Sequence, residues 1–387
     1  MKRVCVVTGT RAEYGLLKPL LDRIHDAEDV ELQLVVTGMH LSAGHGYTYQ
    51  EIERDGFEIT AKIEMLLNSD TSVGVSKSMG IELICLADYF ENSKADMVIL
   101  LGDRYEMLIA AVAAMMQQIP IAHIHGGEAT EGLVDEAIRH AITKMSVLHF
   151  TATEEYRRRV IQLGEQPNMV FNVGALGIEN IQNMELLPKE ELEQRLKFIF
   201  SKKTVMLTYH PVTLERGTAR KQFQMLLDIV DCHEDWKIIF TKANADVAGL
   251  EINTMIDSYV QSHQRSSVCF ASMGQLNYLS ALKHCCMVLG NSSSGIIEAP
   301  SFGIPTIDIG NRQKGRVSAA SVIHCKNDML EIEQAIETAF SPQFRNEIKS
   351  VVNPYEGTDT SKVILEIIRE KLAGQINLKK KFYDMGY

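Results

Sequence analysis

The sequence predicts an α/β fold made of two Rossmann-like domains, each a doubly wound parallel sheet, that face a central cleft. Short apolar runs alternate with helical patterns along the chain, which is typical of parallel sheets covered by helices. The 387 residues exceed what one hydrophobic core usually organises. Polar turns follow apolar runs at two places nearly 300 residues apart, Thr8–Arg11 and Gly290–Gly295, and ligands of open α/β sheets bind at such strand ends.

The first domain is predicted to cover residues 1–175. It begins with a fully apolar strand, and the segment that follows carries leucines at helical spacing. The predicted strands are Val4–Thr8, Leu32–Thr37, Glu58–Ile63, Met97–Leu101, Ile119–Ile124, Val147–Thr151 and Met169–Val173. The predicted helices lie near Ala12–His25, Ser72–Asn92, Tyr105–Gln117, Val134–Met145 and Thr153–Leu163.

The pattern restarts in a second predicted domain, residues 186–357. A passage rich in Gly and Asn, residues 174–183, leads to a charged helix expected at Lys189–Phe200. A last long helix is expected at Glu356–Leu372, and residues 358–387, with their basic tail, are expected to cross back to the first domain. The predicted strands are Thr204–Thr208, Lys237–Thr241, Ser267–Phe270, Met287–Leu289 and Pro305–Ile309.

The composition argues against several classes of protein. A formal net charge of −11 is unfavourable for a nucleic-acid-binding surface. No basic segment precedes an apolar one at the N-terminus, and the longest apolar-rich helical stretch, Met107–Met116, is too short to span a bilayer, so we expect a cytoplasmic protein without a membrane partner. The seven cysteines are an odd number without CxxC spacing, which favours reduced thiols over disulfides or a zinc site.

The serine-rich segment after the apolar run Met287–Leu289 predicts an anion-binding turn. A strand is expected to end at Gly290, and a short helix to begin among the serines. The backbone N–H groups of the helix start, the serine hydroxyls and the positive end of the helix dipole suit a diphosphate. The residues that form this turn are Asn291, Ser292, Ser293, Ser294 and Gly295.

Further charged residues extend this predicted site. Glu298 falls in the same short helix, where its carboxylate could accept both hydroxyls of a ribose, and Arg312 and Arg316 follow the next strand. Near the N-terminus, Arg11 stands at the carboxyl end of the first strand. The alternative interpretation of the serine segment is an N-cap followed by a surface loop.

An acid and a base stand side by side at the end of another predicted strand. Asp103 and Arg104 follow the apolar run that ends at Leu101 and precede a helix. Arg104 could bind a phosphate while Asp103 hydrogen-bonds or deprotonates a sugar. The alternative is that Asp103 only caps the helix.

Two histidines end the next predicted strand. His123 and His125 would share one face by the alternation of a strand, and a Gly-rich turn with Glu128 follows. Such a pair could bind a metal, but no third ligand stands at a suitable spacing. We therefore favour a proton-shuttling or hydrogen-bonding role for His125, with the other histidine structural.

A third group of polar residues begins the helix that follows. Asp135 and Arg139 are four residues apart, which fits a solvated surface pair, although Asp135 could also project into the cleft. In the second domain, His210 and Asn244 come directly after strands and are placed to reach a ligand from the opposite wall.

Familiar motifs of other enzyme classes are missing. The sequence has no GxGxxG after a strand, which weakens nicotinamide chemistry, and no GxxxxGK[ST] for phosphoryl transfer. The serine-rich turn lacks the first glycine of GxSxG, which disfavours an α/β-hydrolase serine.

As an ordered set, these motifs closely resemble the hydrolysing UDP-N-acetylglucosamine 2-epimerases of bacterial sialic-acid synthesis, from Met1 to about residue 365. The motifs are Gly9-Thr10-Arg11-Ala12-Glu13-Tyr14-Gly15, Gly102-Asp103-Arg104, His123-Ile124-His125-Gly126-Gly127-Glu128, Ile138-Arg139-His140-Ala141-Ile142-Thr143-Lys144, His210-Pro211, Gly290-Asn291-Ser292-Ser293-Ser294-Gly295 and Arg312-Gln313-Lys314-Gly315-Arg316. The resemblance implies a GT-B fold whose C-terminal domain holds most of the nucleotide. It also implies a reaction without metal or cofactor that yields N-acetylmannosamine and UDP, in a homodimer or homotetramer.

The resemblance also implies roles for individual residues. The acid–base set is Asp103, His125, Asp135, Glu128 and His210. The UDP-sugar contacts are Arg11, Arg104, Arg139, His210, Asn244, Ser292, Ser293, Ser294, Gly295, Glu298 and Arg316. The chain departs from the non-hydrolysing relatives, which carry a glutamate at the position of His125 and a lysine at that of Leu16.

The implied chemistry requires elimination rather than simple deprotonation. Carbon 2 of the sugar has no adjacent carbonyl, so UDP must leave carbon 1 as the proton is lost, and water then adds to the resulting glycal. Three alternatives stay open: a GT-B glycosyltransferase, a sugar-nucleotide sensor without turnover, and the same reaction on UDP-2,4-diacetamido-2,4,6-trideoxyglucose.

Overall fold

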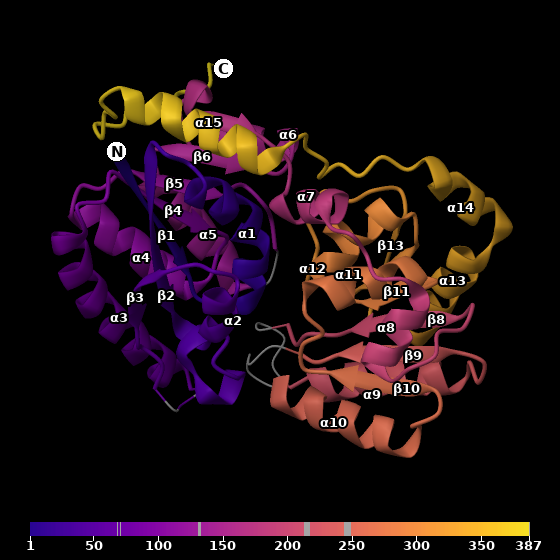
Figure 1. Ribbon diagram of the computed structural model, residues 1–387. Coiled ribbons are helices and arrows are strands. Elements are labelled where there is room, and N and C mark those ends of the chain that lie inside the picture. The colour runs from indigo at the N-terminus through magenta and orange to yellow at the C-terminus, as the bar shows by residue number, and fades with distance from the viewer. Residues whose placement is uncertain (68, 70, 131–132, 213–216, 244–248, 387) are drawn as a thin grey trace. The chain divides into compact units, whose positions relative to one another are not determined.

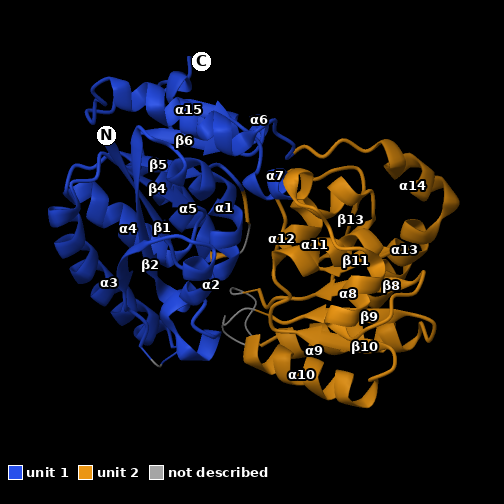
Figure 2. Cartoon of the chain, viewed as in Figure 1, with its two compact units in different colours: residues 1–128, 134–180, 355–387 blue, residues 129–133, 181–354 orange. Residues whose placement is uncertain are grey.

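The computed structural model describes residues 1–387 except 68, 70, 131–132, 213–216, 244–248 and 387. The chain divides into two compact units (Figure 2). Unit 1 comprises residues 1–128, 134–180 and 355–387, and unit 2 comprises residues 129–133 and 181–354. Each unit holds one parallel sheet with helices connecting its strands (Figure 1), so the prediction of two Rossmann-like folds is confirmed.

Unit 1 contains a seven-stranded sheet in the order β3-β2-β1-β4-β5-β6-β7. The order reverses between β1 and β4, so the chain runs outward in both directions from this switch point, where open α/β sheets bind their ligands. The strands are β1 (Lys2–Thr8), β2 (Val30–Thr37), β3 (Ile59–Ile63), β4 (Met97–Leu101), β5 (Ile121–Ile124), β6 (Leu148–Thr151) and β7 (Val170–Asn172).

Helices connect these strands, and their ends follow local signals. For example, α1 starts at a capping box in which Thr10 and Glu13 satisfy each other's backbone N–H groups. The helices are α1 (Arg11–His25), α2 (Tyr49–Arg54), α3 (Ser72–Ser93), α4 (Tyr105–Met116), α5 (Val134–Met145), α6 (Glu154–Gln162), α7 (Leu176–Asn183) and, after unit 2, α15 (Thr360–Ala373).

Unit 2 contains a six-stranded sheet in the order β10-β9-β8-β11-β12-β13, with its switch point between β8 and β11. The strands are β8 (Thr204–Thr208), β9 (Lys237–Thr241), β10 (Ser267–Phe270), β11 (Met287–Gly290), β12 (Thr306–Ile309) and β13 (Val322–Cys325). The helices are α8 (Lys189–Leu196), α9 (Ala219–Asp231), α10 (Gly249–Ser262), α11 (Gln275–His284), α12 (Ser293–Ile297), α13 (Met329–Phe340) and α14 (Pro342–Glu347).

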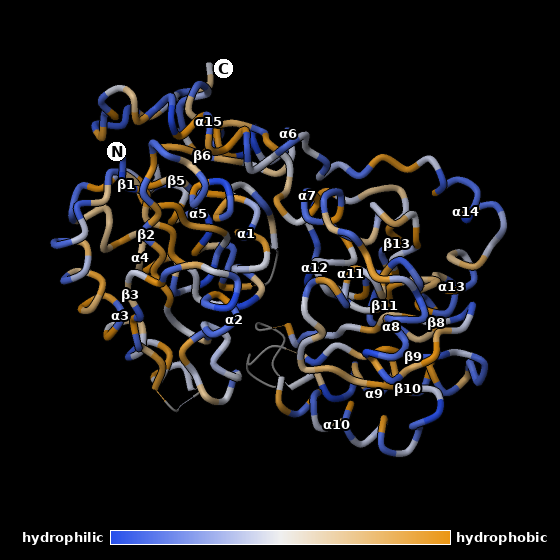
Figure 3. Tube along the Cα trace, in the orientation of Figure 1, coloured by the Kyte–Doolittle hydropathy of each residue, from blue (hydrophilic) through white to orange (hydrophobic). Residues whose placement is uncertain are grey.

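The central strands of both sheets are buried on both faces, and successive residues pack into different cores. In β1, Val4 and Val6 belong to one cluster of unit 1, whereas Cys5 and Val7 belong to the other. Figure 3 shows hydrophobic residues concentrated along the strands of each unit. Because strand interiors are fully used for packing, polar side chains with chemical roles are confined to the strand ends.

The C-terminal segment belongs to unit 1. Apolar residues of α15, such as Ile364 and Ile368, share a core cluster with Leu17 and Leu20 of α1. The tail continues along the same unit, where Lys380 Nζ lies 2.6 Å from Glu165 Oε2. Within the described part of the chain, no helix is both long enough and apolar enough to cross a membrane.

Three expectations about secondary structure were wrong, and one strand was missed. The helix expected at Lys189–Phe200 ends at Leu196, because Lys197 takes a left-handed conformation with φ 51°. The last helix begins at Thr360 rather than Glu356. Residues 174–183 are not only a connection but contain α7. Strand β13 was not predicted, because an edge strand that is only partly buried lacks a continuous apolar run.

Candidate active site

At the switch point of unit 1, the backbone N–H groups that could bind an anion are already bonded to a carboxylate of the protein. The carboxylate of Glu13 accepts the backbone N–H groups of Gly9 (2.8 Å) and Thr10 (3.1 Å). Those donors, at the start of α1, would otherwise suit a phosphate. Arg11, the first residue of the helix, lies 2.9 Å from Glu51 in a half-exposed ion pair. Unit 1 therefore offers side chains rather than helix N–H groups to a ligand here.

A buried arginine connects three acidic segments of unit 1. Arg139 is only 1% exposed, and its Nη2 pairs with Asp103 Oδ2. Its Nη1 donates to the backbone oxygen of Glu128 and to Glu136 Oε2, both at 2.9 Å. One guanidinium thus ties the end of β4 to the turn after β5 and to α5. We expect Arg139 to position these groups, and the substrate contact that the resemblance implied stays a prediction.

The acidic side chains around Arg139 differ in exposure. The Asp103 side chain retains 25% exposure beside its ion pair, so it can still meet a ligand. Asp135 is partly buried in the first turn of α5. Sequence spacing placed Asp135 beside Arg139 on α5. The structure also pairs Arg139 with Asp103, although these two residues are 36 positions apart.

The two histidines have different environments. Strand β5 ends at Ile124, and His125 takes a left-handed conformation with φ 65°, so the alternation expected to place both histidines on one face does not extend to His125. Burial lowers the pKa of His123 to about 3, and its ring bonds to Gly102 O (2.8 Å) and Thr143 Oγ1 (3.1 Å). His123 is therefore a neutral structural residue.

His125 is paired with an acid. Its Nδ1 lies 3.3 Å from Glu128 Oε1, and its Nε2 is buried without a hydrogen-bond partner among the described residues. A glycine is required in the intervening turn, because a Cβ on Gly127 would lie 2.4 Å from the backbone oxygen of Tyr156. In the same described part, no three His, Cys, Asp or Glu side chains are grouped as metal ligands.

In unit 2, one amide fixes the switch point. The side chain of Asn291, at the end of β11, accepts the N–H of His210 (2.7 Å) and donates to its carbonyl (2.8 Å). Gly290 makes this approach feasible, since a Cβ there would lie 1.9 Å from Thr208 O. Burial, aided by the charge of Arg312, lowers the pKa of His210 to about 3, so it acts as a neutral hydrogen-bonding group. Asn244, expected nearby, lies outside the described residues.

The serines of the turn after β11 have different structural roles. Ser292 is the N-cap of α12 and accepts the N–H of Ser294. Ser293 is the first residue of that helix. Gly295 packs closely on the sheet, because a Cβ there would lie 2.7 Å from Thr306 Cγ2. The N-cap alternative raised from the sequence thus describes Ser292 correctly, while the role of Ser293 toward a ligand stays a prediction.

Ser294, four positions before Glu298, contacts Tyr278, a residue that the sequence analysis did not single out. Tyr278 Oη, from α11, donates to Ser294 Oγ at 2.6 Å. The pKa of the half-buried Glu298 is raised by burial, and the hydrogen bond from Ser294 opposes that rise. A hydroxyl that accepts from one neighbour can donate to another, so we expect Tyr278, Ser294 and Glu298 to act as an oriented relay. Tyr278 lies 16 residues before Ser294 and carries no motif.

The loop with the predicted arginines is held from beneath. Arg312 Nη1 (3.1 Å) and Gln313 Nε2 (2.8 Å) both donate to the carbonyl oxygen of Asn291. Arg316, half-buried, belongs to the same loop. The loop is therefore fixed to the residue that also holds His210.

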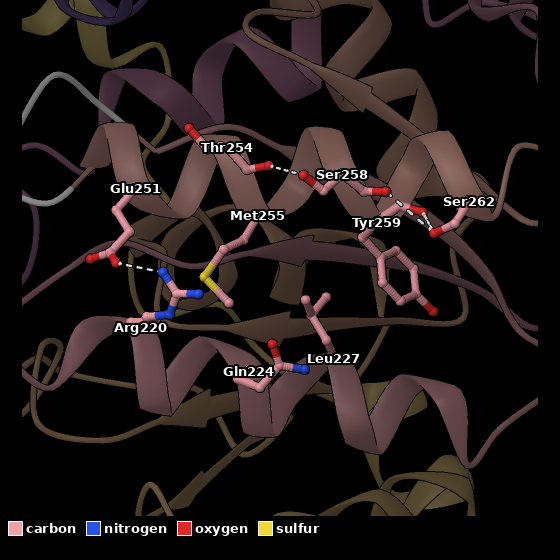
Figure 4. Close-up of a pocket in the computed structure, with 9 residues that line it drawn as sticks. All are labelled: Arg220, Gln224, Leu227, Glu251, Thr254, Met255, Ser258, Tyr259 and Ser262. Atoms are coloured by element: carbon pink, nitrogen blue, oxygen red, sulfur yellow. Dashed lines mark hydrogen bonds and ion pairs between the residues drawn. The ribbon is translucent and has the colours of Figure 1, made fainter.

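A separate groove of about 500 Å³ lies between α9 and α10 of unit 2 (Figure 4). Arg220 and Glu251 form an ion pair of 3.2 Å across it, and Tyr259 lies at its other end. None of the predicted site residues that the structure describes lines this groove. The candidate active site is therefore defined by the strand ends, not by this groove.

Two Rossmann-like units with ligand-binding residue types at both switch points are typical of α/β enzymes that bind nucleotides. Residues 22–369 match the family model described as UDP-N-acetylglucosamine 2-epimerase. The chain belongs to the UDP-N-acetylglucosamine 2-epimerase family, and the resemblance to its hydrolysing members is confirmed.

Two relatives and one solved structure illustrate the similarity. The GDP/UDP-N,N'-diacetylbacillosamine 2-epimerase (hydrolyzing) of Campylobacter jejuni is 42% identical over 89% of each chain. The polysialic acid biosynthesis protein P7 of Escherichia coli is 38% identical over 100% of this chain and 98% of its own. The crystal structure of UDP-GlcNAc 2-epimerase from Neisseria meningitidis bound to UDP-GlcNAc has a TM-score of 0.81 at 19% identity, covering 96% of this chain and all of that one, which shows the shared fold.

Replacing Tyr278 with Phe should reduce affinity for UDP by about 0.5–1.5 kcal/mol, the usual net value of one hydrogen bond. The loss should disappear with 2′,3′-dideoxyuridine diphosphate, because we expect the relay to act through Glu298 on the ribose hydroxyls. Calorimetric titration measures both, and Tyr259→Phe, on α10, is the matched control. An equal loss with both nucleotides would contradict the relay.

Replacing Glu82 with Gln should remove a pH-dependent loss of stability. Glu82, on α3, is fully buried, and burial together with the charge of Glu106 raises its pKa to about 9, while Glu13 adds to the rise and Thr37 and Arg104 oppose it. In the folded protein, the Glu82 carboxyl group keeps its proton up to about pH 9, whereas in the unfolded chain it loses the proton near the ordinary pKa of glutamate. The free energy of unfolding therefore falls as the pH rises between these two pKa values.

Urea denaturation from pH 6 to 9 measures this effect. The stability advantage of Glu82→Gln over the wild type should grow with pH by up to about 1.4 kcal/mol per unit. Parallel curves for the two proteins would show that Glu82 ionises normally.

Proposed function

We propose that this protein is a hydrolysing 2-epimerase of a UDP-linked 2-acetamido sugar, releasing UDP and the free sugar epimerised at carbon 2. The observation that carries the proposal is the 42% identity over 89% of the chain to the Campylobacter diacetylbacillosamine enzyme. That relative favours UDP-2,4-diacetamido-2,4,6-trideoxyglucose as substrate. The polysialic acid relative favours UDP-N-acetylglucosamine and the product N-acetylmannosamine as the second candidate.

Unit 2 is assigned to the nucleotide. The turn at Ser292 and Ser293 and the loop with Arg316 present hydroxyl and guanidinium donors, which suit a diphosphate. Glu298, oriented by Ser294, suits the ribose hydroxyls. These donors favour the charge that develops on UDP as it leaves carbon 1.

Unit 1 is assigned to the proton transfers. Loss of the proton at carbon 2 and its later return from the other side require two groups on opposite faces of the sugar. Asp103, held by Arg139, and Asp135, on α5, are the carboxylates, and the His125–Glu128 pair supplies a further proton-transfer group. His210 is neutral and contributes hydrogen bonds rather than a charge.

Incubating the purified protein with each donor tests the proposal directly. Proton NMR should show free 2-epimerised sugar and UDP from at least one donor in the absence of an acceptor. A GT-B glycosyltransferase would release little free sugar from donor alone, and a sensor would bind without turnover. The ratio of kcat/KM for the two donors decides the substrate.

Asp103→Asn and Asp135→Asn should each lower turnover by at least ~100-fold, the usual effect of removing a general acid or base. Both should still bind UDP within about tenfold, because we assign neither Asp103 nor Asp135 a contact with UDP. In deuterated water the wild-type product should carry deuterium at carbon 2. The exposed Asp26→Asn is the matched control. Retention of the original hydrogen, or near-normal turnover in both variants, would refute these transfers.

A further inference from the structure

Arg104 is held by a carboxylate from its own segment. Glu106 accepts hydrogen bonds from Arg104 Nε (3.1 Å) through Oε2 and from Nη2 (3.0 Å) through Oε1. Glu106 is fully buried, whereas the Arg104 side chain retains 24% exposure. The pair therefore has a buried acceptor and an arginine that still reaches the surface.

The environment of Glu106 restrains this geometry further. The ends of two other strands close around it: a Cβ on Gly38, after β2, would lie 3.0 Å from Glu106 Oε1, and one on Gly9, after β1, would lie 3.4 Å from its Cβ. Glu13 Oε1 lies 3.9 Å from Arg104 Nε on the remaining side. Glu106 thus has little room to release the guanidinium.

The contact leaves one nitrogen of Arg104 available. Nε and Nη2 are used by Glu106, and Nη2 also approaches Met39 Sδ at 4.0 Å. Among the described residues, neither Glu106 nor Glu13 accepts from Nη1, and Nη1 is not one of the buried nitrogens that lack a partner. A planar guanidinium fixed along one edge presents its remaining donors in one direction, which reduces the entropy lost when an acceptor binds.

We propose that Glu106 is a positioning residue that fixes Arg104 so that Nη1 donates to an anionic oxygen of the nucleotide sugar. The inference rests on the proposed function and adds to it a residue that no sequence motif assigned. Because the buried carboxylate neutralises the guanidinium, Arg104 acts through the direction of its hydrogen bonds more than through net charge. A lysine could not replace it, since an ammonium group lacks the planar fork.

A double-mutant cycle on turnover tests the proposal. Arg104→Met and Glu106→Gln should each lower kcat/KM for the preferred donor by about tenfold or more. The double variant should be no slower than Arg104→Met within about threefold, because Glu106 acts only through Arg104. Arg104→Lys, which keeps the charge, should behave like Arg104→Met.

Controls separate positioning from folding. Glu179→Gln, another buried glutamate of unit 1, which bonds to Ser361 rather than to Arg104, should stay within about twofold of wild type. Circular dichroism and thermal melting identify variants that fail to fold. If Arg104→Met fails to fold, Arg104→Lys takes its place in the cycle.

Each contrary result has a distinct meaning. A further tenfold loss when Glu106→Gln is added to either Arg104 variant would overturn the positioning role. Near-normal kinetics in both Arg104 variants would overturn the ligand contact while leaving the epimerase proposal intact. Failure of the wild-type protein to form a 2-epimerised product from either donor would overturn the proposed function and, with it, the substrate role of Arg104.

Discussion

Burial of both faces of a parallel sheet is the constraint on which the rest of this structure depends. The interior residues of β1 and β4 are fully enclosed by two clusters, so neither strand has room for a reactive side chain along its length. All strands of a parallel sheet end at one edge, and the reversal of strand order leaves neighbouring ends there uncovered. Chemistry is therefore restricted to a few residues after each strand.

The two switch points use this constraint in different ways. In unit 1 the first helix N-terminus is occupied by Glu13, and the neighbouring strand ends supply Asp103, His125 and Glu128. In unit 2 the corresponding turn supplies hydroxyls and arginines, with a neutral His210 held by Asn291. The acidic unit suits proton transfer, and the donor-rich unit suits a diphosphate.

The buried charges of Arg139 and Glu106 in unit 1 are retained because each has a partner. Arg139 is almost completely buried, and its cost of desolvation is offset by the Asp103 and Glu136 carboxylates and the Glu128 carbonyl. Arg104 and Glu106 repeat this arrangement at the end of β4. Removing one partner would leave a buried charge, so these pairs also keep the strand ends in place.

The sequence by itself determined the two Rossmann-like folds, most strands and the segments that end at the switch points. Apolar runs and helical spacing report burial and local conformation, which are encoded residue by residue, so Thr204–Thr208 and Met97–Leu101 were predicted with their observed bounds. The edge strand β13 and helix α7 lacked such patterns, and His125 left the strand alternation through its left-handed backbone.

Tertiary structure alone decided which charged groups share a partner. Arg139 meets Asp103 across 36 residues, Tyr278 meets Ser294 from another helix, and Gly38 closes over Glu106 from a different strand. None of these contacts leaves a periodic or motif signal, because each depends on the order in which strands cross within a sheet. The physical reason is that local sequence specifies what must be buried, whereas the crossing order specifies what it is buried against.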